Sequence, residues 1–124
     1  MPRFVILEHD HPFLHWDLML EAGAVLQTWR LAAAPDVGVA PIEATALGDH
    51  RALYLDYEGP VSGKRGTVKR WDAGVFTETP ASTAATRILI LEGMRVFGRC
   101  RLRHVEGSSW RFEWEFTMAP EPAP

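Results

Sequence analysis

"FLHWDLMLE", residues 13–21, is the clearest strand signal in the sequence, because its side chains alternate strictly between two rows. One set of alternate positions is Leu14, Trp16, Leu18 and Leu20, and the other is Phe13, His15, Asp17, Met19 and Glu21. Successive side chains of a β-strand point to opposite faces. We therefore expect a strand with one core-facing row and one polar row that displays His15 and Asp17.

The segments on either side of this strand also read as short strands separated by turn signals. They are "RFVILE" (3–8), "VLQTWRL" (25–31), "GTVKRWDAGVFTE" (66–78), "TRILILEG", "RVFGRCRLRH" and "SWRFEWEFT". We expect residues 66–78 to form two strands around a Trp-Asp-Ala-Gly turn, in which Trp71 and Asp72 have a structural role. "DHRALYLDY" (49–57) holds at most a short helical turn. No segment has helix-length periodicity, which argues against an α/β fold. The pattern predicts an all-β protein, a small closed β-barrel of about eight strands with at most short helical turns.

Length and composition are those of one globular domain. The chain has 124 residues, of which 47% are hydrophobic and 23% charged, so we expect one barrel domain over residues 1–118 and a disordered proline-rich tail over 119–124. No apolar run reaches the roughly 20 residues that span a bilayer, and the start lacks the pattern of a signal peptide. We expect a cytoplasmic protein with no membrane partner. The single cysteine, Cys100, excludes an intrachain disulfide and a cysteine-based zinc site.

The net charge of −3 hides an asymmetry along the chain. Residues 1–61 hold three basic and nine acidic side chains, whereas residues 62–111 hold ten basic and four acidic ones. An acidic N-terminal half suits a cation site. The basic second half suits phosphate contacts, but the overall negative charge argues against avid non-specific binding to DNA.

"EHDHPFLHWD", residues 8–17, gathers three of the five histidines and three carboxylates. A turn around Pro12 would pair the two flanking strands and bring His9 beside His15 and Asp17. Two imidazoles and one carboxylate suit borderline divalent metals such as Mn²⁺, Fe²⁺ or Zn²⁺. The alternative is a histidine-rich polar turn that binds nothing. A cupin-type metal motif fails, because His15 stands where the glutamate after His-x-His is expected.

Several blocks of the sequence resemble, in order, one known family. They are "HDHPFLHWDLMLEAG" (9–23), "TWRLAAAP" (28–35), "DHRALYLDYEG" (49–59), "GTVKRWDAGVF" (66–76), "ILEGMRVFGRCRLRH" (90–104) and "WRFEW" (110–114). Together they are similar to the 3′-phosphoesterase domain of bacterial DNA ligase D, and the likeness covers residues 3–116. Blocks in the correct order over nearly the whole chain are a specific signal.

The resemblance implies a small β-barrel that trims 3′-terminal ribonucleotides and 3′-phosphates from DNA before ligation in non-homologous end joining. It implies a divalent metal, Mn²⁺ above all, with Zn²⁺ or another transition metal as alternatives. The family's metal ligands carry over onto His9, His15 and Asp17, and its catalytic histidine and tyrosine onto His50 and Tyr54. The implied partners are DNA or DNA–RNA 3′ ends and a ligase or other end-joining proteins.

The chain departs from the family where cations are expected. Met19 stands in place of an arginine, Ala33 in place of a lysine, and Ile42 in place of a further arginine in a poorly aligned loop. Candidate replacements for substrate binding are Arg30, Arg51, Lys64 and Arg65, whose other interpretation is solvated surface charge. We expect Met19→Arg to cost little in folding, because its strand face is predicted to be polar.

Three functions remain open on this sequence. The first is an active, metal-dependent 3′-phosphoesterase for DNA ends. The second is a non-catalytic relative that binds metal or nucleic acid after losing its phosphate-clamping arginine. The third is a metal-dependent hydrolase for a smaller phosphoester, since lost arginines also fit a changed substrate.

The arginine-rich "RVFGRCRLRH" invites a nucleic-acid interpretation, with Arg95, Arg99, Arg101 and Arg103 on one strand face. A cross-strand charge ladder explains the pattern without DNA, because a hairpin would set Arg101 and Arg103 opposite Glu113 and Glu115. We favour the ladder. Cys100 falls on the opposite face, where we expect it to be packed rather than reactive.

Overall fold

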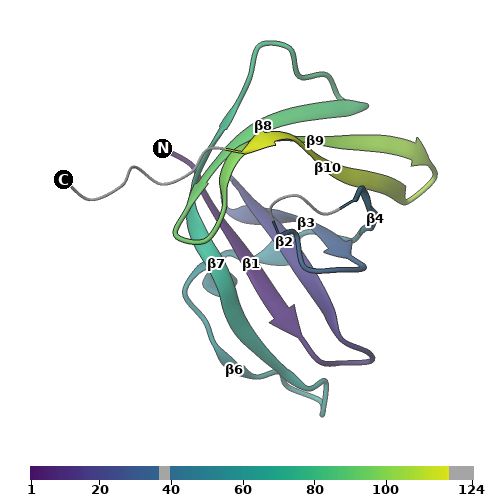
Figure 1. Cartoon of the computed structure of the whole chain (residues 1–124). Coiled ribbons are helices and arrows are strands. Elements are labelled where there is room, and N and C mark those ends of the chain that lie inside the picture. The colour runs from purple at the N-terminus through teal and green to yellow at the C-terminus, as the bar shows by residue number, and fades with distance from the viewer. Residues whose placement is uncertain (37–39, 118–124) are drawn as a thin grey trace.

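The computed structural model describes residues 1–36 and 40–117, and all of its strands join one antiparallel sheet (Figure 1). The strands are β1 (Arg3–His9), β2 (His15–Ala22), β3 (Val25–Leu31), β4 (Ile42–Ala46), β5 (His50–Arg51), β6 (Gly59–Pro60), β7 (Thr67–Glu78), β8 (Thr86–Gly93), β9 (Phe97–Glu106) and β10 (Ser109–Thr117). One 3₁₀ turn, η1 (Ala52–Leu55), follows β5 and is the helical turn expected within 49–57. The predicted disordered tail, 119–124, lies outside the described residues.

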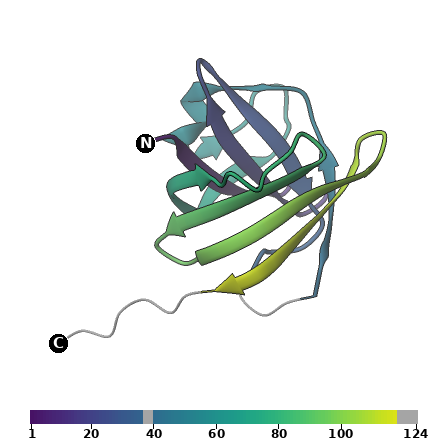
Figure 2. The same cartoon turned by 90° about the horizontal axis from the view of Figure 1, so that it is seen from above.

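The sheet closes into a barrel of eight strands, which confirms the predicted fold. The strand order is β1-β2-β3-β4-β10-β9-β8-β7, and β7 pairs again with β1. The two shortest strands are additions to this ring, β5 at the edge of β3 and β6 at the edge of β7. Figure 2 shows the green-to-yellow C-terminal strands curling across one side of the purple N-terminal strands. Over the described residues, no helix has the length and apolar character needed to cross a membrane.

Alternation along β1–β3 sends one set of apolar side chains into the barrel interior. Phe4 and Ile6 of β1 point inward, as do Leu18 and Leu20 of β2. The predicted core row of residues 13–21 is therefore correct from position 16 onward. It is wrong at Leu14, which is 53% exposed and precedes the first residue of β2.

The outer face of the same strands is apolar as well. Residues 47–66, which we call the covering segment, pass over it. Its buried cluster consists of Val5, Leu7, Met19, Leu26, Leu55 and Val68, and we call it the outer cluster. Leu55 comes from η1, in the covering segment. Met19 is only 2% exposed. The expected polar face around Met19 is therefore wrong, since only its end near His15 and Asp17 is polar.

Residues 66–78 do not form two strands around a turn. They form the single strand β7, which meets β1 through an irregularity in register opposite Ile6 and Leu7. Asp72 is buried there and accepts hydrogen bonds from the backbone N–H groups of Met94, Arg95 and Val96 at 2.9, 3.0 and 2.8 Å. Asp72 therefore has a structural role, as expected. It holds the β8–β9 turn against the continuous strand β7 and does not belong to a turn of its own.

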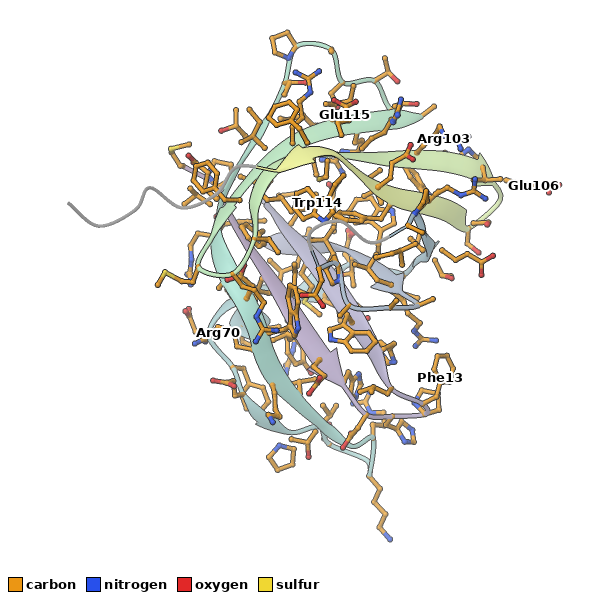
Figure 3. The ribbon with its side chains drawn as sticks, viewed as in Figure 1. Phe13, Arg70, Arg103, Glu106, Trp114 and Glu115 are labelled. Carbon is orange, nitrogen blue, oxygen red and sulfur yellow. The ribbon has the colours of Figure 1, made fainter. Side chains whose placement is uncertain are left out.

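The charge ladder is present on the outer face of β9 and β10, where Figure 3 labels Glu115. Its ion pairs join Arg99 to Glu115 at 2.7 Å and Arg101 to Glu113 at 2.9 Å. Arg103 was expected to face a glutamate and instead lies opposite Arg111. Arg95 precedes β9 and lies over the Trp71 ring, 4.4 Å from its centroid, so it does not share the strand face.

Cys100 is fully buried in the barrel interior, as expected. Burial raises the pKa of its thiol well above the ordinary range. A thiol that resists ionisation is a poor nucleophile and a poor metal ligand, so Cys100 has a packing role.

Candidate metal centre

Three candidate metal ligands converge where β1 runs into β2. Within this hairpin His9 is paired with His15, and Asp17 follows on the same face as His15. One ligand atom from each residue lies within 4.8 Å of the others. Asp17 Oδ2 is 3.3 Å from His15 Nε2 and 3.7 Å from His9 Nδ1. His15 and Asp17 are buried, and His9 is partly exposed. In Figure 1 this turn lies at the lower right of the barrel.

Backbone carbonyls fix the proton position on both imidazoles. His9 Nε2 lies 2.7 Å from the Arg65 carbonyl oxygen, and His15 Nδ1 lies 2.8 Å from that of Phe13. A carbonyl oxygen only accepts, so each of these nitrogens carries the proton and donates it. The remaining nitrogens, Nδ1 of His9 and Nε2 of His15, face Asp17, and each carries a lone pair when its ring is neutral. Proteins orient metal-ligating histidines in this way.

The three donors fit a divalent ion. With both rings neutral, the two lone pairs face a carboxylate, and Asp17 Oδ1 is buried with no hydrogen-bond partner among the described residues. Such a set of acceptors is electrostatically unfavourable without a cation between them. Metal–ligand bonds of about 2.0–2.2 Å place neighbouring ligand atoms roughly 3.0–3.5 Å apart, close to the observed 3.3 and 3.7 Å. Two imidazoles and one carboxylate suit a borderline metal.

The ligands line a cavity of about 260 Å³. Of the predicted site residues, the cavity includes His9, His15, Asp17, Arg30, His50, Tyr54 and Arg65. Arg51 and Lys64 are exposed and do not line it. The structure thus gathers the proposed ligands, the proposed catalytic pair and two of the four candidate substrate-binding cations around one space.

The covering segment delivers His50 and Tyr54 to this cavity. His50 begins β5 and is paired with Leu26 of β3, and Tyr54 lies in η1. The Gly48 carbonyl oxygen accepts a hydrogen bond from His50 Nδ1 at 2.9 Å, which leaves Nε2 for a substrate. The His50 and Tyr54 rings meet edge to face, with centroids 6.1 Å apart.

Two of the three positions where the resemblance implied a family cation, residues 33 and 42, lie away from the cavity. Ile42 is buried in the barrel interior, on the opposite side of the sheet from the outer cluster. Ala33 is exposed, and neither residue lines the cavity. Met19 does line it. Of the three substituted positions, only residue 19 bears directly on this site.

The sequence interpretation missed several wall residues. His11 and Pro12 line the cavity from the β1–β2 turn, and Leu47 and Val61 line it from the covering segment. The position of His11 between two proposed ligands was a usable signal. The two aliphatic residues lie in connecting segments whose path has no periodic pattern, so nothing in the sequence marks them.

Asp10 fastens the neighbouring loop to the site. Its Oδ1 accepts a hydrogen bond from the Thr67 N–H at 2.8 Å. Gly66 adopts φ +76°, and a Cβ there would meet the Asp10 carboxylate. This contact holds the loop in the position from which the Arg65 carbonyl oxygen reaches His9.

The comparisons with known proteins point to one family. The family model described as the DNA Ligase D 3′-phosphoesterase domain matches residues 7–104. The chain is 34% identical over 114 residues to the multifunctional non-homologous end joining DNA repair protein LigD of Mycobacterium tuberculosis, covering 86% of this chain and 15% of that protein. It is 32% identical over 128 residues to LigD of Pseudomonas aeruginosa, covering 96% of this chain and 15% of that protein. The chain thus spans about 15% of the length of these curated relatives.

Proposed function

The chain belongs to the DNA ligase D 3′-phosphoesterase domain family, and from this premise we propose that it is a divalent-metal-dependent phosphoesterase for the 3′ ends of DNA. The proposed substrates are 3′-terminal ribonucleotides and 3′-phosphates, and the proposed ion is Mn²⁺. The relatives are named as non-homologous end joining proteins, so we propose the same context for this chain. The observation that carries the proposal is the pair of backbone-tethered imidazoles whose free nitrogens face Asp17.

In this proposal His9, His15 and Asp17 hold the ion. A bound divalent ion supplies positive charge that stabilises the negative charge developing on a phosphoryl group. His50, as the doubly protonated imidazolium whose Nδ1–H is held by the Gly48 carbonyl oxygen, would donate its Nε2 proton to the leaving oxygen as a water molecule attacks phosphorus. Tyr54 would offer a hydroxyl donor beside it, and Met19 and Val68 of the outer cluster form an apolar part of the cavity wall.

The test uses two histidine variants, His15→Ala in the cavity and His104→Ala as a matched control. His104 is exposed near the β9–β10 turn, where its Nε2 contacts the Gly107 carbonyl oxygen. Mn²⁺ binding is measured by electron paramagnetic resonance of the free ion. Cleavage is measured on a primer-template that ends in one ribonucleotide or in a 3′-phosphate, with and without Mn²⁺. We expect His15→Ala to lose both properties and His104→Ala to keep both.

A second candidate function is a metal-binding module without catalysis. The observation that favours it is Met19, which lines the cavity at the position where the family carries an arginine. The same experiment separates the two functions. Wild-type protein that binds Mn²⁺ but leaves both 3′ ends intact would favour the binding module. Wild-type protein that binds no Mn²⁺ at millimolar concentration would contradict both candidates.

A further inference from the structure

Arg30 is the cation that lies nearest the proposed ligands along the sheet. It is on β3, directly across from Asp17 of β2 in the antiparallel register. Side chains of directly paired residues share a face of the sheet. Arg30 accordingly lines the same cavity as Asp17 and His50. The next pair on the same face is Met19 and Thr28, so Arg30 is two pairs closer to the β1–β2 turn than Met19.

Phe13 holds the Arg30 side chain in place. The guanidinium carbon of Arg30 lies 5.3 Å from the centroid of the Phe13 ring, within the range of a cation–π contact. The ring also meets His15 edge to face, with centroids 5.7 Å apart. Figure 3 shows Phe13 at the β1–β2 turn, at the edge of the molecule. Arg30 is thereby ordered beside the proposed ligands before any substrate arrives.

The hydrogen-bonding capacity of Arg30 is unused. Its Nε is buried without a hydrogen-bond partner. Within residues 1–36 and 40–117, no hydrogen bond or ion pair to its side chain is found. The other cavity arginine, Arg65, already donates from Nε to the Ser62 carbonyl oxygen at 2.7 Å. The buried Nε–H of Arg30 would gain an acceptor from a bound oxyanion, which removes the cost of leaving that donor unsatisfied.

We propose that Arg30 binds the phosphate of the substrate and that Phe13 is its positioning residue. This deepens the proposed function and rests on it. The ligand class is a phosphate ester at a nucleotide 3′ end, whose oxygens match the planar fork of a guanidinium. The phosphate-binding cation then stands on β3, one strand away from position 19. The substitution by Met19 is compatible with activity because the charge comes from the neighbouring strand.

The experiment is a titration of ¹⁵N-labelled, EDTA-treated full chain with inorganic phosphate at constant ionic strength and pH 7.5. The Arg30 Nε–H resonance reports binding directly. We expect Arg30→Gln to weaken phosphate affinity by roughly tenfold or more, on the scale of a lost hydrogen bond to a charged group. Phe13→Leu keeps the backbone carbonyl that orients His15 and weakens phosphate affinity by about threefold, as expected for one exposed cation–π contact.

Arg51→Gln is the matched control, because Arg51 is an exposed cation near the site that does not line the cavity. It should leave phosphate affinity unchanged within about twofold, the scale of a surface charge. Arg30→Lys retains the charge without the fork and serves if Arg30→Gln does not fold, with an expected loss of about threefold. Two results would overturn the inference. One is wild-type phosphate affinity in the Arg30 variants. The other is no phosphate binding by the wild type at about 50 mM phosphate, roughly the weakest affinity worth testing.

Mn²⁺ affinity, measured on the same proteins, separates this inference from the proposed function. If the wild type binds Mn²⁺ and the Arg30 variants keep wild-type phosphate affinity, the inference alone fails. If the wild type binds no Mn²⁺ but phosphate shifts the Arg30 resonance, the proposed function fails and Arg30 stands as an anion site. Arg30→Gln itself should keep wild-type Mn²⁺ affinity.

Discussion

The two faces of β1, β2 and β3 are both buried, but against different parts of the chain. The inner face joins the barrel interior, a cluster of fifteen buried residues that includes Leu18. The outer face carries the outer cluster of six buried residues, and residues 47–66 cover it. Only the outer cluster is continuous with the cavity, through shared residues Met19 and Val68.

This difference shows how the barrel separates stability from chemistry. Strand alternation places Leu18 in the interior and its neighbours Asp17 and Met19 on the outer face. The interior can therefore fix the strand geometry while the outer face displays the proposed ligands on rigid strands, where positions are more precise than on loops. The covering segment then brings His50 and Tyr54 over the open end of that face.

The largest expected effect comes from substituting, one at a time, two neighbouring residues of β2 that point to opposite faces. Asp17→Asn should reduce Mn²⁺ affinity by about 10²-fold or more and change the free energy of unfolding in EDTA by less than about 1 kcal/mol, because Oδ1 of the buried carboxylate has no hydrogen-bond partner among the described residues. Leu18→Ala should lower the free energy of unfolding by about 3 kcal/mol and leave Mn²⁺ affinity unchanged. Urea denaturation and Mn²⁺ titration of both variants check this. If each variant lost both properties, the two faces would not be separable.

Sequence alternation predicted the parts of this comparison that depend on neighbouring strands. The rows of β2 and the turn around Pro12 follow from local pattern, and with them the convergence of His9 and His15. The continuous strand β7 was missed, because a Trp-Asp-Ala-Gly stretch reads locally as a turn. Pairing with β1 on one side and β8 on the other overrides that signal.

The surroundings of the candidate site were less predictable than its members. The burial of Met19 depends on Leu55 and the path of the covering segment, which joins two-residue strands that leave no periodic pattern. The place of Ile42 in the interior follows from the pairing of β4 with β10, about 70 residues away in sequence. Such long-range pairing determines which departures from the family pattern fall at the site.

The next effect concerns the covering segment. His50→Ala should reduce turnover on a 3′-phosphate end by about 10²-fold, the scale of general acid–base catalysis. Mn²⁺ affinity should not change, because His50 is not one of the grouped ligands. Steady-state rates and Mn²⁺ titration on the same preparation test this. Turnover at the wild-type rate in folded His50→Ala protein would remove His50 from the chemistry and leave the covering segment as a lid only.

A smaller effect is expected at Met19, which lies on the outer face but is as buried as an interior residue. The sequence suggested that Met19→Arg would cost little, but Met19 is 2% exposed among apolar side chains. Burying a guanidinium there should lower the free energy of unfolding by about 2 kcal/mol. Met19→Leu, which conserves volume, should cost less than about 1.5 kcal/mol. Equal stability of Met19→Arg and wild type in urea would mean that the outer cluster opens freely to the cavity.

The smallest effect is a pH dependence that belongs to the barrel and not to the site. Arg87 donates hydrogen bonds to Glu78 and lies over the Trp29 ring, and its hydrogen bond holds the pKa of the Glu78 carboxyl below its usual value. A carboxyl whose pKa is lowered by folding stabilises the protein above its unfolded-state pKa, and this contribution disappears as pH falls through the folded-state pKa. Glu78 is 38% exposed, so solvent screening limits the contribution to less than about 1 kcal/mol.

In EDTA, Glu78→Gln should therefore be slightly less stable than wild type at pH 7, and the difference should vanish between about pH 5 and pH 3. Urea denaturation at both ends of that range measures it. A difference that persists at pH 3 would mean that Glu78 acts through packing rather than charge, and that the acid sensitivity of the barrel arises elsewhere.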